Sequence, residues 1–254
     1  MEEQITIFLM VLTRIFGFFA VAPFFGRREF PFQARAGLAA LVTSIIYPIV
    51  SKNVIQGSVW ETVALFVKEA AVGFLMGFIV FIMFSAVYIL GEIVDFEMGF
   101  GIVSVLDPQI NTQVPILGNF FYILTILIFL SINGHHVLLG MLIRSFEVLP
   151  LGASGLTKNL LYIILESFYG MFEAGVKMSL PLIFSTFLAD FALGIMARTV
   201  PHMNVFIVGL PFKIVIGILF LIIILPTLLT SLEILFTDSY EILKLIIQGM
   251  AKKP

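Results

Sequence analysis

The sequence has no cysteine and little charge. Because no Cys occurs among the 254 residues, neither disulfides nor thiolate metal ligands can contribute to the fold or to a site. Charged residues make up only 12% of the chain, about half the share that is usual in soluble domains. The formal net charge of −2, with Lys and Arg scattered along the chain, excludes the basic surface that nucleic-acid binding requires.

Apolar residues are present in excess instead. They account for 60% of the chain, and the mean hydropathy is +1.13, whereas a soluble domain is about 45–50% apolar. One soluble core cannot bury this much apolar surface, so membrane lipid is the expected surrounding. Apolar segments of about membrane-crossing length are Ile5–Phe25, Ala64–Leu90, Val114–Ile132, Ala174–Ala197 and Val205–Thr230, and Ala36–Val50 is shorter.

These segments predict an all-α fold of five to six long apolar helices. Inside a bilayer the backbone has no water to bond, so spanning segments are helices or barrel strands, and the lengths fit helices. The connections are short and no internal repeat is present, which favours a single domain over residues 1–254. Residues 232–254 are expected to form a C-terminal helix and tail, either amphipathic at an interface or partner or simply the polar end of the last span.

Basic residues leave the topology open. Arg27, Arg28 and Arg35 favour a cytoplasmic first loop, and Lys252 with Lys253 favour a cytoplasmic C-terminus. The loop and the tail lie on one side only if the number of crossings is odd. Six apolar segments do not meet this condition.

Many ionisable residues lie within or beside the apolar segments, where an unpaired charge costs several kcal/mol. We expect these charges to make contacts within the chain or with neighbouring subunits: Arg14, Lys68, Glu69, Glu92, Asp95, Glu97, Glu166, Glu173, Lys177, Asp190, Arg198 and Lys213. Glu173 and Lys177 have the spacing of a helical ion pair. Glu92 and Asp95 share a helical face, which favours contact with basic residues of another helix over a proton or cation relay.

Small and polar residues complete the pattern. Gly73 and Gly77 form a GxxxG spacing that predicts close helix packing. Between two predicted helices, the segment Ser104–Gly118 combines helix-disfavouring prolines with polar side chains. Such backbone is either an exposed loop or, at membrane depth, the lining or closure of a pore. The residues of this candidate plug loop are Ser104, Asp107, Pro108, Gln109, Asn111, Thr112, Gln113, Pro115 and Gly118.

Catalytic and metal-binding patterns are scarce. His135 and His136 are adjacent in the sequence, so on a helix they diverge by about 100° and cannot share a metal as an i, i+4 pair would. His202 has no partner that the sequence reveals, and no GxSxG, HExxH or P-loop occurs. We therefore expect a protein that is not an enzyme and that has no cofactor or metal site.

The run Gly194–Pro211 carries a resemblance to a known family. Its residues Arg198, Pro201, Asn204, Phe206 and Gly209 resemble the signature of the FliR family of flagellar proteins and their virulence-injectisome relatives. Further similarities, which extend to about Leu221, are Gly91-Glu92, Met98-Gly99, Asp107-Pro108, Asn133-Gly134-His135, Ser145-Phe146 and Leu149-Pro150. The signature run is more similar to the flagellar branch.

The resemblance implies a subunit of the type III export gate. Such a subunit assembles as helical hairpins with FliP-like and FliQ-like subunits, associates with an FlhB-like subunit, and resides in the bacterial inner membrane within the flagellar basal body. Unfolded flagellar proteins would pass through the lumen, which the loop matching Ser104–Gly118 would help to close. The alternatives are the injectisome counterpart and a secondary transporter that uses Glu92 and Asp95 for protons, although the internal repeats common in transporters are absent.

Overall fold

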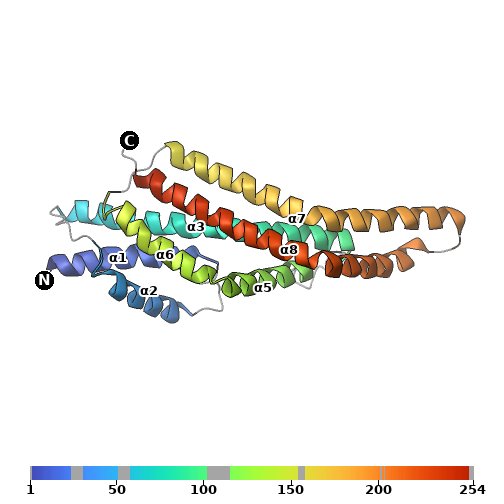
Figure 1. Ribbon diagram of the computed structural model, residues 1–254, viewed down its shortest axis with the longest axis horizontal. Helices are drawn as coiled ribbons and strands as arrows, with labels where there is room; N and C mark the ends of the chain where they lie inside the picture. The colour runs from blue at the N-terminus through green and yellow to red at the C-terminus, as the bar shows by residue number, and fades with distance from the viewer. Residues whose placement is uncertain are drawn as a thin grey trace. The chain divides into compact units, whose positions relative to one another are not determined.

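The computed structural model describes residues 2–23, 31–50, 58–101, 115–153, 158–200, 202 and 204–251. Within these ranges every regular element is an α-helix, and the all-α prediction is confirmed (Figure 1). The helices are α1 (Glu2–Val21), α2 (Phe32–Ile46), α3 (Val59–Met98), α5 (Ile116–Ser131), α6 (Gly134–Val148), α7 (Lys158–Thr199) and α8 (Val205–Ala251).

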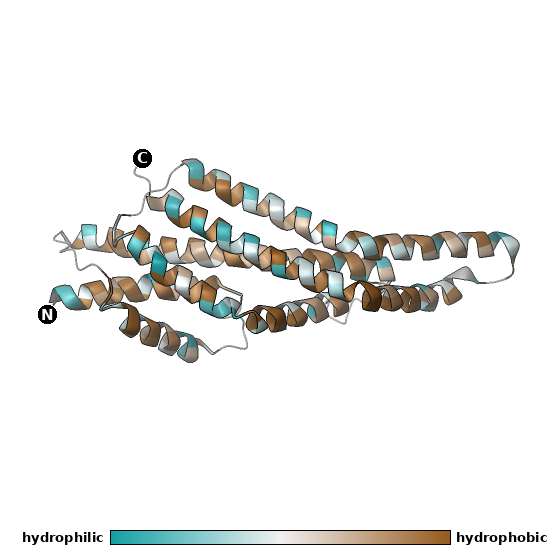
Figure 2. Cartoon of the chain, viewed as in Figure 1, coloured by the Kyte–Doolittle hydropathy of each residue, from teal (hydrophilic) through white to brown (hydrophobic). Residues whose placement is uncertain are grey.

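Three of the helices are much longer than a bilayer crossing. α3, α7 and α8 contain 40, 42 and 47 residues, which corresponds to about 60–70 Å at the rise of an α-helix. A hydrocarbon core is about 30 Å thick and needs about 20 residues. A helix of this length that crosses the bilayer once has about half of its residues outside the hydrocarbon layer. Apolar residues nevertheless run along most of every helix, and α5 is almost wholly apolar (Figure 2).

The number of candidate membrane spans bears on the topology conflict. Among the described residues, four helices are long and apolar enough to cross, namely α1, α3, α7 and α8. The pair α5 and α6 passes the same criterion together but is bent by 68°. If this pair is one broken span, the total is five, the odd number that places both basic clusters on the same side.

The bend between α5 and α6 was not predicted from the sequence. Asn133 has a left-handed backbone, with φ of 57°, and lies directly before Gly134 at the start of α6. Asn tolerates this conformation better than most residues. The Asn133-Gly134 pair was therefore the available signal for a helix boundary, which apolar content alone did not reveal.

The described residues belong to two compact units. The first comprises residues 1–84, 132–169 and 236–254, and the second comprises residues 85–131 and 170–235. In the first unit α1 packs on α2 as an antiparallel pair, with ring contacts from Phe8 to Tyr47 and from Phe16 to Phe32. The single-domain prediction for residues 1–254 stays a prediction.

In the first unit α1 and α3 run parallel and approach each other at glycines. A Cβ built on Gly73 would lie 1.9 Å from the main-chain oxygen of Arg14, and one on Gly77 would lie 2.6 Å from that of Phe18. Because real Cβ atoms are never so close to backbone, only glycine permits this approach. The close packing predicted from the Gly73 and Gly77 spacing is confirmed.

The C-terminal segment continues α8 rather than forming a separate helix, because α8 has no break between Val205 and Ala251. Its apolar side chains Leu232, Leu235, Leu243 and Ile246 are buried, whereas Glu233, Asp238 and Glu241 are exposed. Ile234 and Leu245 of the same stretch are exposed, and the amphipathic role predicted for residues 232–254 stays a prediction.

Candidate functional site

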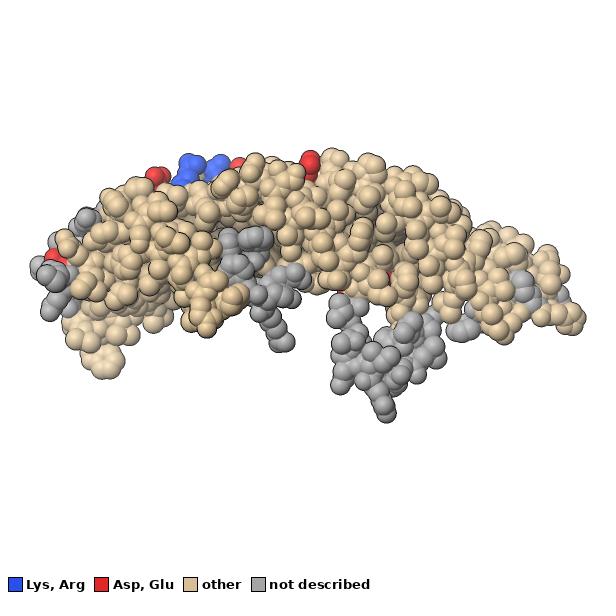
Figure 3. Space-filling view, turned by 90° about the horizontal axis from the view of Figure 1, so that it is seen from below, with Lys and Arg blue, Asp and Glu red and all other residues tan. Residues whose placement is uncertain are grey.

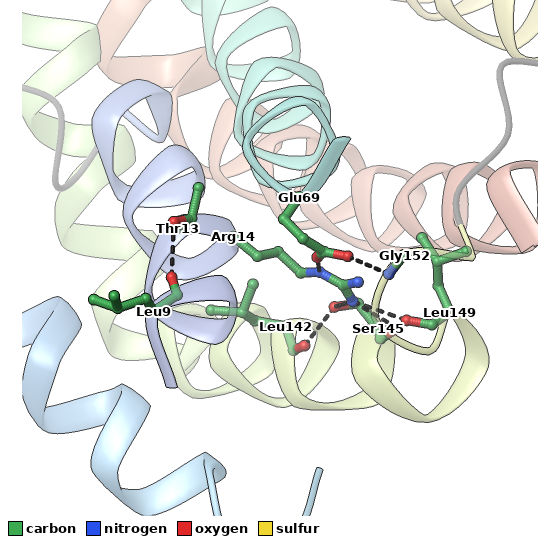
Figure 4. Close-up of polar contacts among 8 residues, drawn as sticks. All are labelled: Leu9, Thr13, Arg14, Glu69, Leu142, Ser145, Leu149 and Gly152. Carbon is green, nitrogen blue, oxygen red and sulfur yellow. Dashed lines mark hydrogen bonds and ion pairs between the residues drawn. The ribbon is translucent and has the colours of Figure 1, made fainter. Parts of the chain in front are cut away.

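A buried ion pair joins α1 to α3 in the first unit. The Nε of Arg14 donates to Oε2 of Glu69 at 2.6 Å, and both side chains are 0% exposed (Figure 4). Glu69 also accepts a hydrogen bond from the backbone N–H of Gly152 at 2.8 Å. Removing two charges from water is costly unless they are paired and hydrogen-bonded. Both side chains are paired here, and of the guanidinium nitrogens Nη2 of Arg14 is the one left without a hydrogen-bond partner.

The same arginine also holds the end of α6. Its Nη1 donates to the main-chain oxygens of Ser145 and Leu149 at 3.2 and 3.1 Å, and its guanidinium lies 4.2 Å from the centre of the Phe146 ring. The Ser145 oxygen also accepts from the N–H of Leu149 at 2.9 Å, whereas the Leu149 oxygen lies beyond the last turn of α6, so the arginine supplies a donor there. One buried side chain thus connects α1, α3 and α6 (Figure 4).

A second buried charge lies in the second unit, on α3. Both carboxylate oxygens of Asp95 accept from the N–H of Leu117 at 3.1 Å, and Oδ2 accepts from the N–H of Gly118 at 3.1 Å. These amides belong to the first turn of α5, whose N–H groups have no partner inside the helix. Asp95 is therefore a helix cap supplied by a different helix.

The signature run includes the last residues of α7 and the first residues of α8, both in the second unit. Asn204 precedes α8, and its Oδ1 accepts from the N–H of Ile207 at 3.3 Å, as an N-cap residue does. Gly209 lies against the Leu193 side chain of α7. A Cβ built on Gly209 would lie 3.2 Å from that side chain. Arg198 is exposed in the last turn of α7. Pro201 and the side chain of Phe206 lie outside the described residues.

Comparison with known proteins agrees with this signature. Residues 5–239 match the model of a family described as "Bacterial export proteins, family 1". The flagellar biosynthetic protein FliR of Bacillus subtilis is 38% identical over 240 residues, which cover 93% of each chain. The chain belongs to the FliR family of bacterial export proteins. The resemblance inferred from Gly194–Pro211 is thereby confirmed.

Other FliR relatives match over similar lengths. FliR of Escherichia coli is 28% identical over 246 residues, which cover 97% of this chain and 94% of that protein. FliR of Aquifex aeolicus is 29% identical over 249 residues, which cover 98% and 96%. The similarity therefore includes nearly all of the chain. The helices that carry Arg14, Glu69 and Asp95 lie within the matched part.

The remaining embedded charges of this FliR-family chain differ in their surroundings. Glu173 and Lys177 form the ion pair predicted from their spacing, at 2.6 Å, and Lys213 pairs with Asp190 at 2.8 Å between α8 and α7. Glu97 accepts a hydrogen bond from Thr186 at 3.4 Å. Among the charges considered, those with exposed side chains are Lys68, Glu92, Glu166, Glu173, Lys177, Asp190 and Arg198.

Glu92 and Asp95, which the sequence groups on one helical face, have different surroundings. Asp95 is buried and bonds to backbone amides of α5, whereas Glu92 is exposed. The start of α5 lies over Asp95 alone, so the two carboxylates face different surroundings despite their three-residue spacing. Within the described residues the partners of Asp95 are thus main-chain donors rather than a basic side chain.

The predicted plug loop is described only at its C-terminal end. Residues 104–113, which include its polar side chains, lie outside the described residues, whereas Pro115 and Gly118 lie at the start of α5. In the described part of the chain no three His, Asp or Glu side chains come together as metal ligands. His135 and His136 contact each other, with ring centres 4.2 Å apart.

Proposed function

We propose that this chain is a non-enzymatic subunit of the flagellar type III protein export gate. It contributes helices to a channel wall that also contains FliP-like and FliQ-like subunits and associates with an FlhB-like subunit in the bacterial inner membrane. Unfolded flagellar proteins are the cargo. The family match over residues 5–239 is the observation that carries this proposal.

The exposed apolar surface supports assembly with other subunits. On the part of α7 in the second unit, exposed large side chains recur at helical spacing: Leu180, Phe184, Phe187, Leu188, Phe191 and Ile195. Charged side chains are sparse as well on another face, which Figure 3 shows from below the view of Figure 1. Because α7 is about twice as long as a bilayer crossing, lipid cannot cover the whole helix. Neighbouring protein is the covering that fits both features.

A co-purification experiment tests the class of protein. The tagged chain, extracted in mild detergent from a flagellated host, is expected to recover FliP-like and FliQ-like subunits. A proton-coupled transporter would instead move a solute when reconstituted alone. The structure adds an argument against that alternative, since Asp95 is engaged with backbone amides. Solute transport by the purified chain without partners would overturn the proposal.

Deletion of the candidate plug loop tests its role in closing the lumen. Removing residues 104–113 is expected to raise the leakage of ions and small solutes through assembled gates, because a closed lumen would lose its obstruction. Leakage is measured as dye or ion entry into cells that express the complete gate. Replacement of the same residues by a Gly/Ser linker of equal length separates loss of side chains from shortening of the connection. Unchanged leakage in both variants would remove the plug from the proposal.

The exposed Glu173–Lys177 pair offers a test of the embedded charges. An exposed pair stabilises a helix by only about 0.3–0.5 kcal/mol, so neutralising either residue is expected to leave the melting temperature of the chain nearly unchanged. Lys177→Glu places two acids side by side and is expected to reduce recovery of the complex, while E173K/K177E restores it. Equal recovery with all variants would show that this pair does not serve assembly.

A further inference from the structure

One residue of α3 makes hydrogen bonds on both sides of residues 102–114. The main-chain oxygen of Asp95 accepts from the N–H of Phe100 at 3.0 Å. Its carboxylate accepts from the N–H groups of Leu117 and Gly118. Phe100 and Leu117 flank this stretch of sequence, so both flanks are tied to Asp95. We call Asp95, Phe100, Leu117 and Gly118 together the Asp95 anchor.

The first flank is a regular helix end. Gly99 has a φ of 86° and donates to the main-chain oxygen of Phe96 at 3.1 Å, while Phe100 donates to that of Asp95. This pair of hydrogen bonds is the Schellman pattern, in which a left-handed residue, usually glycine, ends the helix. α3 therefore stops at a defined residue within one turn of the Asp95 carboxylate.

The second flank depends on Asp95 for its cap. A helix normally receives its cap from a Ser, Thr, Asp or Asn that precedes it in sequence, but the residue before α5 is Pro115. The carboxylate of Asp95 provides the missing acceptors and places negative charge at the positive end of the helix dipole. Asp95 is only 5% exposed, so water cannot readily replace its carboxylate as the acceptor.

The two helices also touch at their backbones. A Cβ built on Gly91 would lie 2.2 Å from the Cα of Gly118, so α3 and α5 approach as closely as glycine allows. The end of α3 is itself held, because Met98 packs against Gly217 of α8 and Glu97 bonds to Thr186 of α7. The start of α5 therefore packs against a part of α3 that also contacts α7 and α8.

We propose that Asp95 is a positioning residue for the segment between α3 and α5. Its carboxylate holds the flank at Leu117 and Gly118 against the end of α3, where main-chain hydrogen bonds already fix the flank at Phe100. This inference rests on the proposed function, in which that segment restricts the lumen. Loss of the Asp95 carboxylate then raises leakage through an otherwise assembled gate, although the loop sequence is intact.

Asp95→Ala and Asp95→Asn test the anchor directly in the full chain, co-purified with its neighbouring subunits. Amide hydrogen exchange at Leu117 and Gly118 is expected to accelerate by about tenfold to a hundredfold in Asp95→Ala, the range expected for loss of a charged helix cap. Asp95→Asn keeps one acceptor oxygen and is expected to show a smaller increase. Glu92→Gln, an exposed carboxylate one turn away on the same helix, is the matched control.

A backbone variant provides a test that leaves the carboxylate in place. Gly91→Ala inserts a methyl group against Gly118 and is expected to displace the start of α5, so that exchange at Leu117 and Gly118 and leakage both rise. Gly101→Ala is its control, because a Cβ at Gly101 meets nothing within 4 Å. If Asp95→Ala does not accumulate, Asp95→Asn and Gly91→Ala still decide the question.

Exchange and leakage together separate the possible failures. Faster exchange at Leu117 and Gly118, leakage that moves toward that of the 104–113 deletion, and normal co-purification support the inference. Unchanged exchange would overturn the anchor, and faster exchange without leakage would overturn its positioning role if the deletion leaks. If the deletion does not leak, the plug proposal fails, and with it the positioning of a plug by Asp95, whatever the exchange rates show.

Discussion

Arg14→Met and Glu69→Gln are each expected to destabilise the first unit severely. Both side chains are fully buried and bonded to each other, and removing one partner of a buried pair costs about 3–5 kcal/mol. Total stabilities are about 5–15 kcal/mol, so such a loss lowers the melting temperature steeply or abolishes accumulation. Arg14 is expected to matter most, since α6 loses its donor to Ser145 and Leu149 as well.

The double variant R14M/E69L distinguishes a need for this pair from a need for its charges. Replacing a buried ion pair by apolar residues of similar size is often neutral or stabilising. Recovery is expected to be only partial here, because the N–H of Gly152 and the carbonyl of Leu149 lose their partners. Thermal unfolding in detergent, with yield as a second measure, provides the comparison.

Exposed residues of the same types are the controls for these variants. Arg144→Met on α6 and Glu166→Gln on α7 remove like charges from exposed positions and are expected to change stability by no more than about 0.5 kcal/mol. The interpretation fails if Arg14→Met lowers the melting temperature no further than Arg144→Met does.

Gly73→Ala is expected to have the second largest effect, because its methyl group would overlap the backbone of α1. A Cβ at this position lies 1.9 Å from the main-chain oxygen and 2.8 Å from the main-chain carbon of Arg14. Backbone on both sides leaves no flexible side chain to move, so α1 and α3 must separate. Overpacking of this kind costs about 1–3 kcal/mol, and the separation also stretches the Arg14–Glu69 contact.

Gly140→Ala is the matched control, in the interior of α6 with nothing within 4 Å of a built Cβ. Alanine there is expected to stabilise the helix by about 0.5–1 kcal/mol. The melting temperatures of the two glycine variants should therefore move in opposite directions. Because Gly73 and Arg14 are in contact, R14M/G73A is expected to lose less stability than the sum of the single variants. Strict additivity, or a harmless Gly73→Ala, would contradict the proposed coupling.

Local sequence pattern was sufficient for several features. The spacing of Gly73 and Gly77 predicted a close helix approach, and the spacing of Glu173 and Lys177 predicted an ion pair that the structure contains. Such predictions succeed because residues three or four apart on a helix share a face whatever the rest of the fold does. The Gly194–Pro211 run identified the family for a similar reason, since a turn with its cap and packing glycine is local.

The buried charges required the tertiary structure. Arg14 and Glu69 are 55 residues apart, and Arg14 and Leu149 are 135 apart, so no periodicity relates them. The sequence marked each residue as an embedded charge without naming its partner. It also grouped Asp95 with Glu92, because spacing along α3 cannot show which carboxylate lies under the start of α5.

Membership in the export family, an all-helical membrane fold and the faces of individual helices were determined by the sequence alone. Hydropathy, helical spacing and the signature run are properties of short stretches of chain, so they do not depend on which distant segments pack together. The tertiary structure decided which charges are paired, that α6 is a separate helix bent from α5, and that Asp95 caps α5. Those outcomes depend on which segments far apart in the sequence pack together. This packing is determined by the burial of apolar surface over the whole chain.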